Sequence, residues 1–184
     1  MKIIGTFEVV KNSLYAVQYK GQKMQEFERL FAQWNHTVFL DSFFSQHIED
    51  LQHVFWQGMK VEDAIKKTIR DAIELEQKIK YLAEQGRLSK FENLSELFKP
   101  LHNRPSKLEE FEKSKAKGLM YNSWLRVYAI RLKPNLYLVS GGAIKLTQDM
   151  NHRKHLLLEL EKLKITRNYL AGEDESGLEF MEMF

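Results

Sequence analysis

The chain contains no cysteine and only three prolines among its 184 residues. The absence of cysteine excludes disulfide bonds, thiol nucleophiles and zinc sites with cysteine ligands. No apolar run approaches the roughly 20 residues of a membrane span, and the N-terminal MKIIGTFEVV contains none of signal-peptide length. These absences predict a soluble, cytoplasmic protein without a membrane partner.

Several signatures of enzyme active sites are also lacking. There is no glycine-rich phosphate loop, no GxSxG or HExxH motif and no kinase signature. The predicted strands carry no pair of acidic residues of the kind that holds two catalytic metal ions. His152 and His155 lie three residues apart, but a metal site would need further ligands, and the nearest carboxylate is Asp149. The sequence therefore predicts neither a metal site nor a bound cofactor.

Acidic residues are scarce in one part of the chain. Residues 1–100 carry 14 Lys and Arg against 14 Asp and Glu, whereas residues 101–170 carry 14 against 6. Residues 171–184 have five acidic residues and no basic one. A basic region of this kind attracts phosphate groups. The alternative is a solvated helix face beside a strand edge that lysines protect from aggregation.

Hydrophobic residues make up 43% of the chain, which predicts one folded domain over residues 1–171. Periodicity and turn chemistry predict strands at Ile3–Val10, Leu14–Tyr19, 124–132, 136–140 and 143–146, with turns at 11–13, 133–135 and 141–142. The predicted helical segments are 22–35, 39–55, 61–85, 108–119 and 152–170, the last capped by Asp149 or Asn151. The predicted fold is α+β. A small antiparallel sheet, made of an N-terminal hairpin and a C-terminal three-stranded meander, has a helical insertion at about 37–117 and a closing C-terminal helix.

The segment 61–85 has a narrow apolar seam that includes Ile65, Ile69 and Ile79. Such a seam faces a partner helix, and we expect an antiparallel helical hairpin beside the sheet. An intermolecular coiled coil, and hence a homodimer, is the alternative. The acidic tail 172–184 is predicted to be flexible, and it either covers the basic surface or binds a partner protein.

The clearest candidate site lies on the strands 124–132 and 143–146. Strand alternation places Trp124, Arg126 and Tyr128 on one face, and Lys145 adds a second cation if it shares that face. Two cations beside two aromatic rings are suited to holding phosphate and stacking a base. The alternative is that Arg126 forms a structural ion pair and Trp124 belongs to the core.

The basic start of the last helix supplies further candidates. His155 is suited to acid–base chemistry on a phosphodiester at neutral pH, and Arg153 and Lys154 precede it directly. We take Arg131 and Lys154, with Trp124 and Tyr128, as candidate RNA-binding residues. Cleavage at such a site would be metal-independent, with a cation stabilising the transition state.

The segment LRVYAIR…NLYLVSGGAIKLTQDM…ELEKLKITRNYL resembles the C-terminal half of the RelE/ParE-superfamily toxins, in particular the phage-derived HigB-like group. The resemblance covers about 50 residues. It implies a ribosome-dependent mRNA endonuclease that a cognate antitoxin, usually of helix-turn-helix type, neutralises. It also implies attack of the RNA 2′-hydroxyl on the adjacent phosphate. Arg126 matches the strand arginine of that family, Lys145 the lysine after the hairpin, and Arg153 or His155 the region before the final helix.

Two features depart from that family. The chain is nearly twice as long, with the excess at about 37–117, and the strand 136–140 lacks the family's cation. The alternatives are a non-catalytic nucleic-acid-binding accessory protein of a mobile element, and an interaction protein built around the seam of 61–85.

Overall fold

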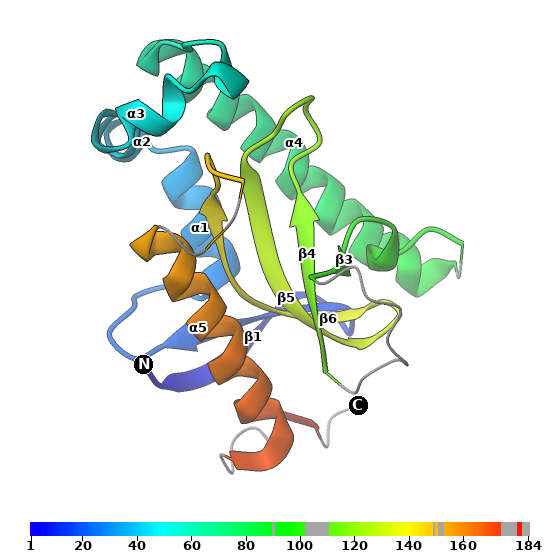
Figure 1. Cartoon of the computed structure of the whole chain (residues 1–184). Coiled ribbons are helices and arrows are strands. Elements are labelled where there is room, and N and C mark those ends of the chain that lie inside the picture. The colour runs from blue at the N-terminus through cyan, green and yellow to red at the C-terminus, as the bar shows by residue number, and fades with distance from the viewer. Residues whose placement is uncertain (90, 102–110, 149, 151–152, 174–179, 182–184) are drawn as a thin grey trace.

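The computed structural model describes residues 1–89, 91–101, 111–148, 150, 153–173 and 180–181. The fold is α+β, with a six-stranded mixed sheet and helices on both of its faces (Figure 1). The strands are β1 (Ile3–Val10), β2 (Leu14–Tyr19), β3 (Lys99–Pro100), β4 (Glu112–Lys117), β5 (Leu125–Lys133) and β6 (Leu136–Ile144). The α-helices are α1 (Glu26–Trp34), α2 (Thr37–Gln46), α3 (Ile48–Leu51), α4 (Val61–Leu88) and α5 (Lys154–Asn168). The shorter turns of helix are η1 (Val54–Trp56), η2 (Leu94–Glu96) and η3 (Tyr169–Glu173).

The sheet has the strand order β1-β2-β6-β5-β4-β3. The predicted N-terminal hairpin is present, because β1 and β2 are antiparallel and joined by a turn in which Asn12 has a positive φ. The two halves of the sheet meet where β2 pairs with β6 in parallel, through Leu14 to Tyr137 and Ala16 to Val139. The sheet is therefore mixed, and the prediction of a purely antiparallel sheet is wrong at this junction.

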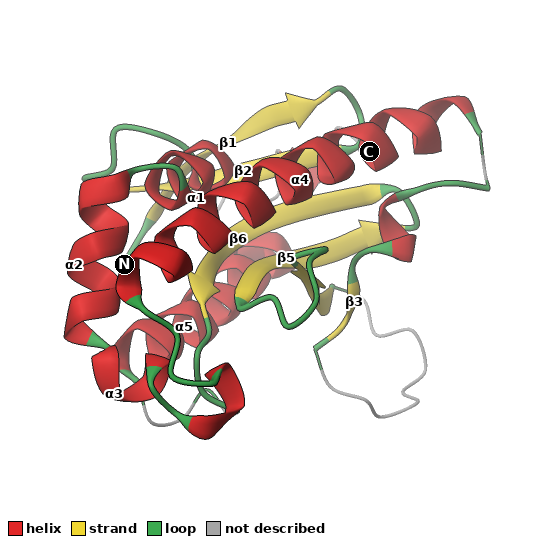
Figure 2. Ribbon diagram, turned by 90° about the horizontal axis from the view of Figure 1, so that it is seen from above, coloured by secondary structure: helices red, strands yellow, loops and turns green. Residues whose placement is uncertain are grey.

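Two hydrophobic clusters cover the two faces of the sheet. On one face α1, α2 and α4 pack against the strands through residues such as Leu30, Leu40 and Leu75. On the other face α5 packs through Leu156 and Leu163. In Figure 1 α5 lies in front of the sheet and α4 behind it, and Figure 2 shows α4 beginning beside the α2–α3 segment and running along the sheet. No helix in the described ranges combines the length and the apolarity needed to cross a bilayer.

The C-terminal meander consists of β4, β5 and β6, which shifts it by one strand from the prediction. The segment 112–117 belongs to the highly charged stretch 108–119, for which the sequence predicts an exposed helical turn. It is instead strand β4, in which Ser114 and Ala116 are buried and the lysines between them face the other way. The predicted turn at Gly141 and Gly142 is also wrong, because both residues lie inside β6.

Close packing explains why β6 contains two adjacent glycines. A Cβ atom on Gly142 would lie 2.6 Å from the carbonyl oxygen of Arg126 and 2.8 Å from Leu30 Cδ1. A Cβ atom on Gly141 would lie 2.0 Å from Glu159 Oε2. The glycines therefore let α1 and α5 approach the sheet at this point.

Gly142→Ala is therefore expected to lower the free energy of unfolding by about 1–3 kcal/mol, since a backbone carbonyl cannot move aside as a side chain can. Chemical denaturation measures this loss. Gly5→Ala is the matched control, because its Cβ atom would meet only the half-exposed ring of Phe7, at 3.3 Å. Equal stability of the two variants would contradict this account of β6.

The helical region differs from the prediction in that the predicted helix 39–55 is divided into α2, α3 and η1. The seam of α4 packs inside the chain, as predicted for a helix beside the sheet, with Ile79 fully buried. Part of the tail also contacts the core, because Phe180 is buried and its ring lies 5.4 Å from that of Tyr15. The predicted caps Asp149 and Asn151 lie outside the described residues, as do the acidic residues Asp174, Glu175, Glu179 and Glu182.

Candidate functional site

A cavity of about 790 Å³ lies at the end of the sheet where β4, β5 and the segment after β6 face η1. Four cationic side chains line it: Lys115, Lys117, Arg126 and Lys145. We call this cavity the basic pocket. The strand register brings the four together, because Lys117 pairs with Arg126 and the Lys145 amide bonds to the carbonyl of Trp124.

Backbone carbonyls hold three of these cations in place. The Arg126 guanidinium donates hydrogen bonds to the carbonyls of Ser123 and Leu125, at 2.9 and 2.7 Å. Lys115 Nζ donates to the carbonyl of Leu101 at 3.1 Å, and Lys145 Nζ donates to the carbonyl of Gln148 at 2.5 Å.

Arg126, Lys115 and Lys117 form no ion pair with another described residue. Within the part of the chain that is described, no carboxylate oxygen lies within 4.0 Å of Lys115, Lys117 or Arg126. The positive charge of these three residues is therefore not neutralised by an ion pair, and an anion can take that place.

Burial and neighbouring cations make the charged form of Lys115 less favourable. Burial lowers the pKa of Lys115, and the charges of Lys117 and Arg126 lower it further. Burial also lowers the pKa of Arg126, although the negative charge of Asp71 partly opposes this. A bound phosphate would counter this repulsion, because an opposite charge favours the charged form of each group.

Tyr128 adds a neutral hydrogen-bonding group to the basic pocket. Its side chain is buried, and its hydroxyl donates to Met150 Sδ at 3.4 Å. Burial raises the pKa of Tyr128 well above the usual range, so that the hydroxyl stays protonated at neutral pH and can only act as a hydrogen-bond donor or neutral acceptor there.

Trp124 does not share the face of Arg126 and Tyr128, which corrects the prediction that it stacks a base. It precedes β5, and its ring lies in the cluster on the α4 side, with Phe44 at 5.4 Å and Trp56 at 5.0 Å between ring centroids. Its indole N–H donates to Thr68 Oγ1 at 3.0 Å. Trp124 is therefore a core residue.

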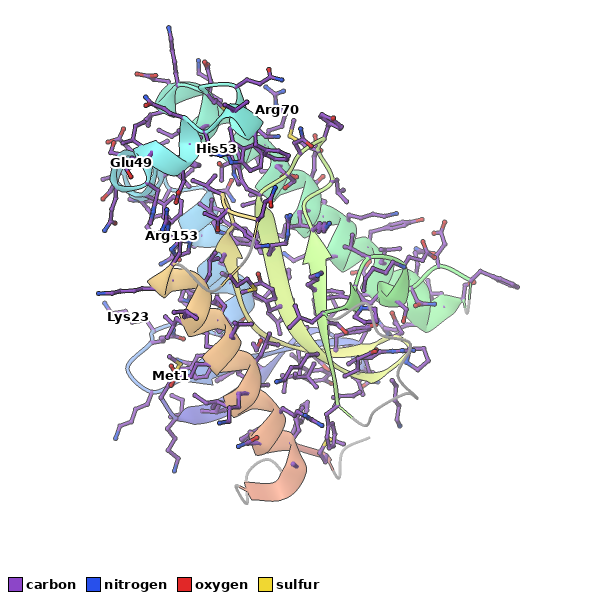
Figure 3. The ribbon with its side chains drawn as sticks, in the orientation of Figure 1. Met1, Lys23, Glu49, His53, Arg70 and Arg153 are labelled. Carbon is purple, nitrogen blue, oxygen red and sulfur yellow. The ribbon has the colours of Figure 1, made fainter. Side chains whose placement is uncertain are left out.

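Arg153, Lys154 and His155 lie at a second cleft, of about 500 Å³, between α1, α2 and α5. Arg153 donates to Asp50 Oδ2 at 2.7 Å, and Figure 3 shows its label between the start of α5 and the α2–α3 segment. Among the described residues the basic pocket and this cleft share no lining residue, and they are linked by the hydrogen bond from Arg153, which lines the cleft, to Asp50, which lines the basic pocket. Arg153 and His155 therefore lie outside the pocket that Arg126 and Lys145 line, and the structure does not support catalytic roles for them in that pocket.

The imidazole of His155 is held in one tautomer. Its Nε2 lies 3.1 Å from the carbonyl oxygen of Ile144, which can only accept, so Nε2 carries the proton. The ring of His47 lies 4.9 Å away. Burial lowers the pKa of both imidazoles, and the charge of Arg153 contributes to both shifts. Both rings are therefore neutral at pH 7.

Lys162 and Glu159, which line the second cleft, belong to a buried ion cluster. In it Lys162 Nζ lies 3.1 Å from Glu26 Oε2 and 2.8 Å from Glu159 Oε1. Arg29 forms two hydrogen bonds to the same Glu26 carboxylate. Hydrogen bonds and charge from Arg29 and Lys162 outweigh the burial that raises the pKa of Glu26, and this pKa is lowered. Arg29 and Lys162 therefore have carboxylate partners, which Lys115, Lys117 and Arg126 lack among the described residues.

Arg131 lies outside both cavities and forms an ion pair of 3.5 Å with Glu112.

Lys115 and Lys117 were missed as site residues. The alternation of Lys113, Lys115 and Lys117 with small residues was the signal that could have identified them. His152 lies outside the described residues.

No group of three or more histidine, aspartate and glutamate side chains in the described ranges is arranged to hold a metal ion. Comparison of the chain with known proteins identifies no relative. No protein-family model, no curated protein and no solved structure matches the chain.

Proposed function

We propose that the chain binds RNA at the basic pocket and acts as the toxin of a type II toxin–antitoxin module, cutting mRNA on the ribosome. The observation that supports this most directly is the group of Lys115, Lys117 and Arg126, which lack ion-pair partners in the described structure. Phosphate is the anion that such a group of lysine and arginine holds best. The proposed partners are ribosome-bound mRNA and a cognate antitoxin of helix-turn-helix type, with the chain itself in the cytoplasm.

The proposed cleavage is an internal transfer at one phosphodiester. The 2′-oxygen forms a bond to phosphorus, its proton leaves, and the bond from phosphorus to the 5′-oxygen of the next nucleotide breaks. The products are a 2′,3′-cyclic phosphate and a 5′-hydroxyl. Arg126 and Lys117 would stabilise the charge on the phosphoryl oxygens, which is where preorganised cations contribute most.

The 2′-hydroxyl proton would pass to water, and Lys115 would contact the phosphoryl oxygens together with Arg126 and Lys117. Lys145 would supply the proton that the departing 5′-oxygen needs. The sequence suggested His155 and Arg153 as catalytic residues for the cleavage, but both line the second cleft.

The test is induction of the gene in a bacterial host, with growth recorded and total RNA mapped for new 5′ ends. We expect growth arrest and cleavage inside translated messages. Arg126→Ala and Lys115→Ala should each reduce cleavage by about 100-fold or more, as loss of a transition-state contact does. Arg87→Ala and Lys66→Ala are the matched controls, because both side chains are exposed on α4 and do not line the pocket. Full toxicity of the Arg126 and Lys115 variants would contradict the site.

The same pocket supports one second function, that of a non-catalytic nucleic-acid-binding accessory protein of a mobile element. It predicts salt-dependent RNA binding without new 5′ ends. For a single strand, each lost phosphate contact lowers the slope of log K against log salt by about 0.7. The third alternative, an interaction protein built on the seam of α4, has less support because the seam residue Ile79 is buried within the chain.

A further inference from the structure

We infer that the basic pocket takes unpaired RNA, with bases stacked on the exposed rings of Phe55 and Tyr121. This inference rests on the proposed function and adds the class of substrate. The two rings are 52% and 89% exposed, and they lie in the two loops that border the basic pocket. Each loop is fixed to the core by buried hydrogen bonds, so that the exposure of each ring is built into the fold.

The first loop is η1. Trp56 is buried, and its indole N–H donates to the carbonyl of Leu146 at 2.9 Å. The ring of Phe55 lies edge-on to that of Trp56, with centroids 4.6 Å apart. The backbone N–H of Phe55 donates to His53 Nδ1 at 3.3 Å, and Figure 3 labels His53 at this end of the molecule. Phe55 and His53 both line the basic pocket.

The second loop connects β4 to β5. The buried carboxylate of Asp71 on α4 accepts hydrogen bonds from the backbone N–H of Met120 and from the hydroxyl of Ser123. Lys67 Nζ donates to the carbonyl of Tyr121 at 3.1 Å. A Cβ atom on Gly118 would lie 2.2 Å from Asp71 Oδ2, so the loop closes tightly over this carboxylate.

The backbone of Tyr121 is thus fixed on both sides, while its ring points into solvent. Its neighbours Met120 and Asn122 line the basic pocket, although Tyr121 itself does not. The two loops are linked through the core, because the rings of Trp56 and Trp124 lie 5.0 Å apart. A fixed backbone at each ring reduces the conformational entropy that is lost on binding, which favours stacking.

Aromatic rings beside a cationic groove are the arrangement by which proteins bind single strands. Bases in a duplex are already stacked and cannot insert between side chains, so a duplex should gain only from the cations. Phe55 and Tyr121 would therefore select unpaired RNA, while Lys115, Lys117 and Arg126 hold its phosphates.

Binding of a fluorescent 12-nucleotide RNA to the full chain tests this, with anisotropy as the readout. Uniform 2′-O-methylation removes the nucleophile, so that binding is measured without cleavage. We expect the single strand to bind at least tenfold more tightly than the matching duplex. Phe55→Ala and Tyr121→Ala should each weaken binding of the single strand by about tenfold, with the salt slope and duplex binding unchanged. Phe91→Ala is the matched control, because Phe91 is 91% exposed and does not line the pocket.

The outcomes separate the inference from the proposed function. Wild-type affinity of both variants for the single strand, or equal binding of strand and duplex, would overturn the stacking inference alone. Tighter binding of a deoxyribose strand of the same sequence would overturn the assignment to RNA. Absence of binding of any nucleic acid at low salt would overturn the proposed function as well. A salt slope that falls in Lys115→Ala but not in Tyr121→Ala would support both.

Discussion

Lys162→Met is expected to lower the free energy of unfolding by about 3–5 kcal/mol, because it leaves two buried carboxylates without their shared cation. Lys162 is 3% exposed and lies between Glu26 and Glu159, which are 0% and 4% exposed. Methionine fills a similar volume but cannot neutralise a charge. The free energy of unfolding at pH 7, from urea denaturation, measures the effect.

Lys80→Met is the matched control for this prediction. Lys80 forms a short ion pair with Glu76 on the exposed face of α4, where its side chain is 46% exposed. Removal of an exposed pair of this kind changes stability by less than about 1 kcal/mol. If the Lys162 and Lys80 variants were equally stable, the ion cluster between α1 and α5 would not be a structural element.

Glu159→Gln is expected to remove most of a pH dependence of stability between pH 4.5 and 7. Burial raises the pKa of Glu159 from 4.5 to about 7; Lys162 lowers it only in part, and Glu26 adds to the rise. The folded state therefore binds the proton more tightly than the unfolded state, and stability falls as pH rises through this range. At about 1.4 kcal/mol per pKa unit, the loss amounts to about 3 kcal/mol above pH 7.

The measurement is the difference in free energy of unfolding between wild type and Glu159→Gln, taken from pH 4.5 to 8. The difference should shift in favour of the variant by about 3 kcal/mol over this range. Comparing the two proteins cancels the opposite contribution of Glu26, whose pKa is lowered in the folded state. A difference that is constant with pH would show that Glu159 ionises as freely as in the unfolded chain.

Local patterns predicted much of the fold. The β1–β2 hairpin, α1, α4, β5 and α5 follow from apolar periodicity and from the turn chemistry at residues 11–13 and 133–135. The parallel pairing of β2 with β6 could not be predicted, because it joins segments about 120 residues apart with no local signature. Two adjacent glycines are typical of a turn, so the sequence suggested a turn at Gly141 and Gly142. The structure explains them instead by the closeness of Glu159 to Gly141 and of Leu30 to Gly142.

The site was predictable in part. Arg126 and Lys145 were candidate site residues, with a shared face left open, and both line the basic pocket with Tyr128. Trp124 was misplaced because it precedes the first paired residue of β5, and strand alternation does not extend to it. Lys115 and Lys117 were missed because β4, which lies between β5 and the short edge strand β3, is rich in lysine and lacks the apolar alternation that marks a strand. The contributions of Asp50 and η1 depend on the tertiary fold.

The parallel pairing of β2 with β6 also determines when the sheet can close during synthesis. The hairpin β1–β2 is made first, but its partner strand is completed only at residue 144. Until then the inner edge of β2, whose residues 14–17 are fully or nearly buried in the finished protein, has no strand beside it. Unpaired strand edges are prone to aggregation. Slowing elongation before residue 136 should therefore prolong the aggregation-prone stage, whereas slowing it after residue 144 should not.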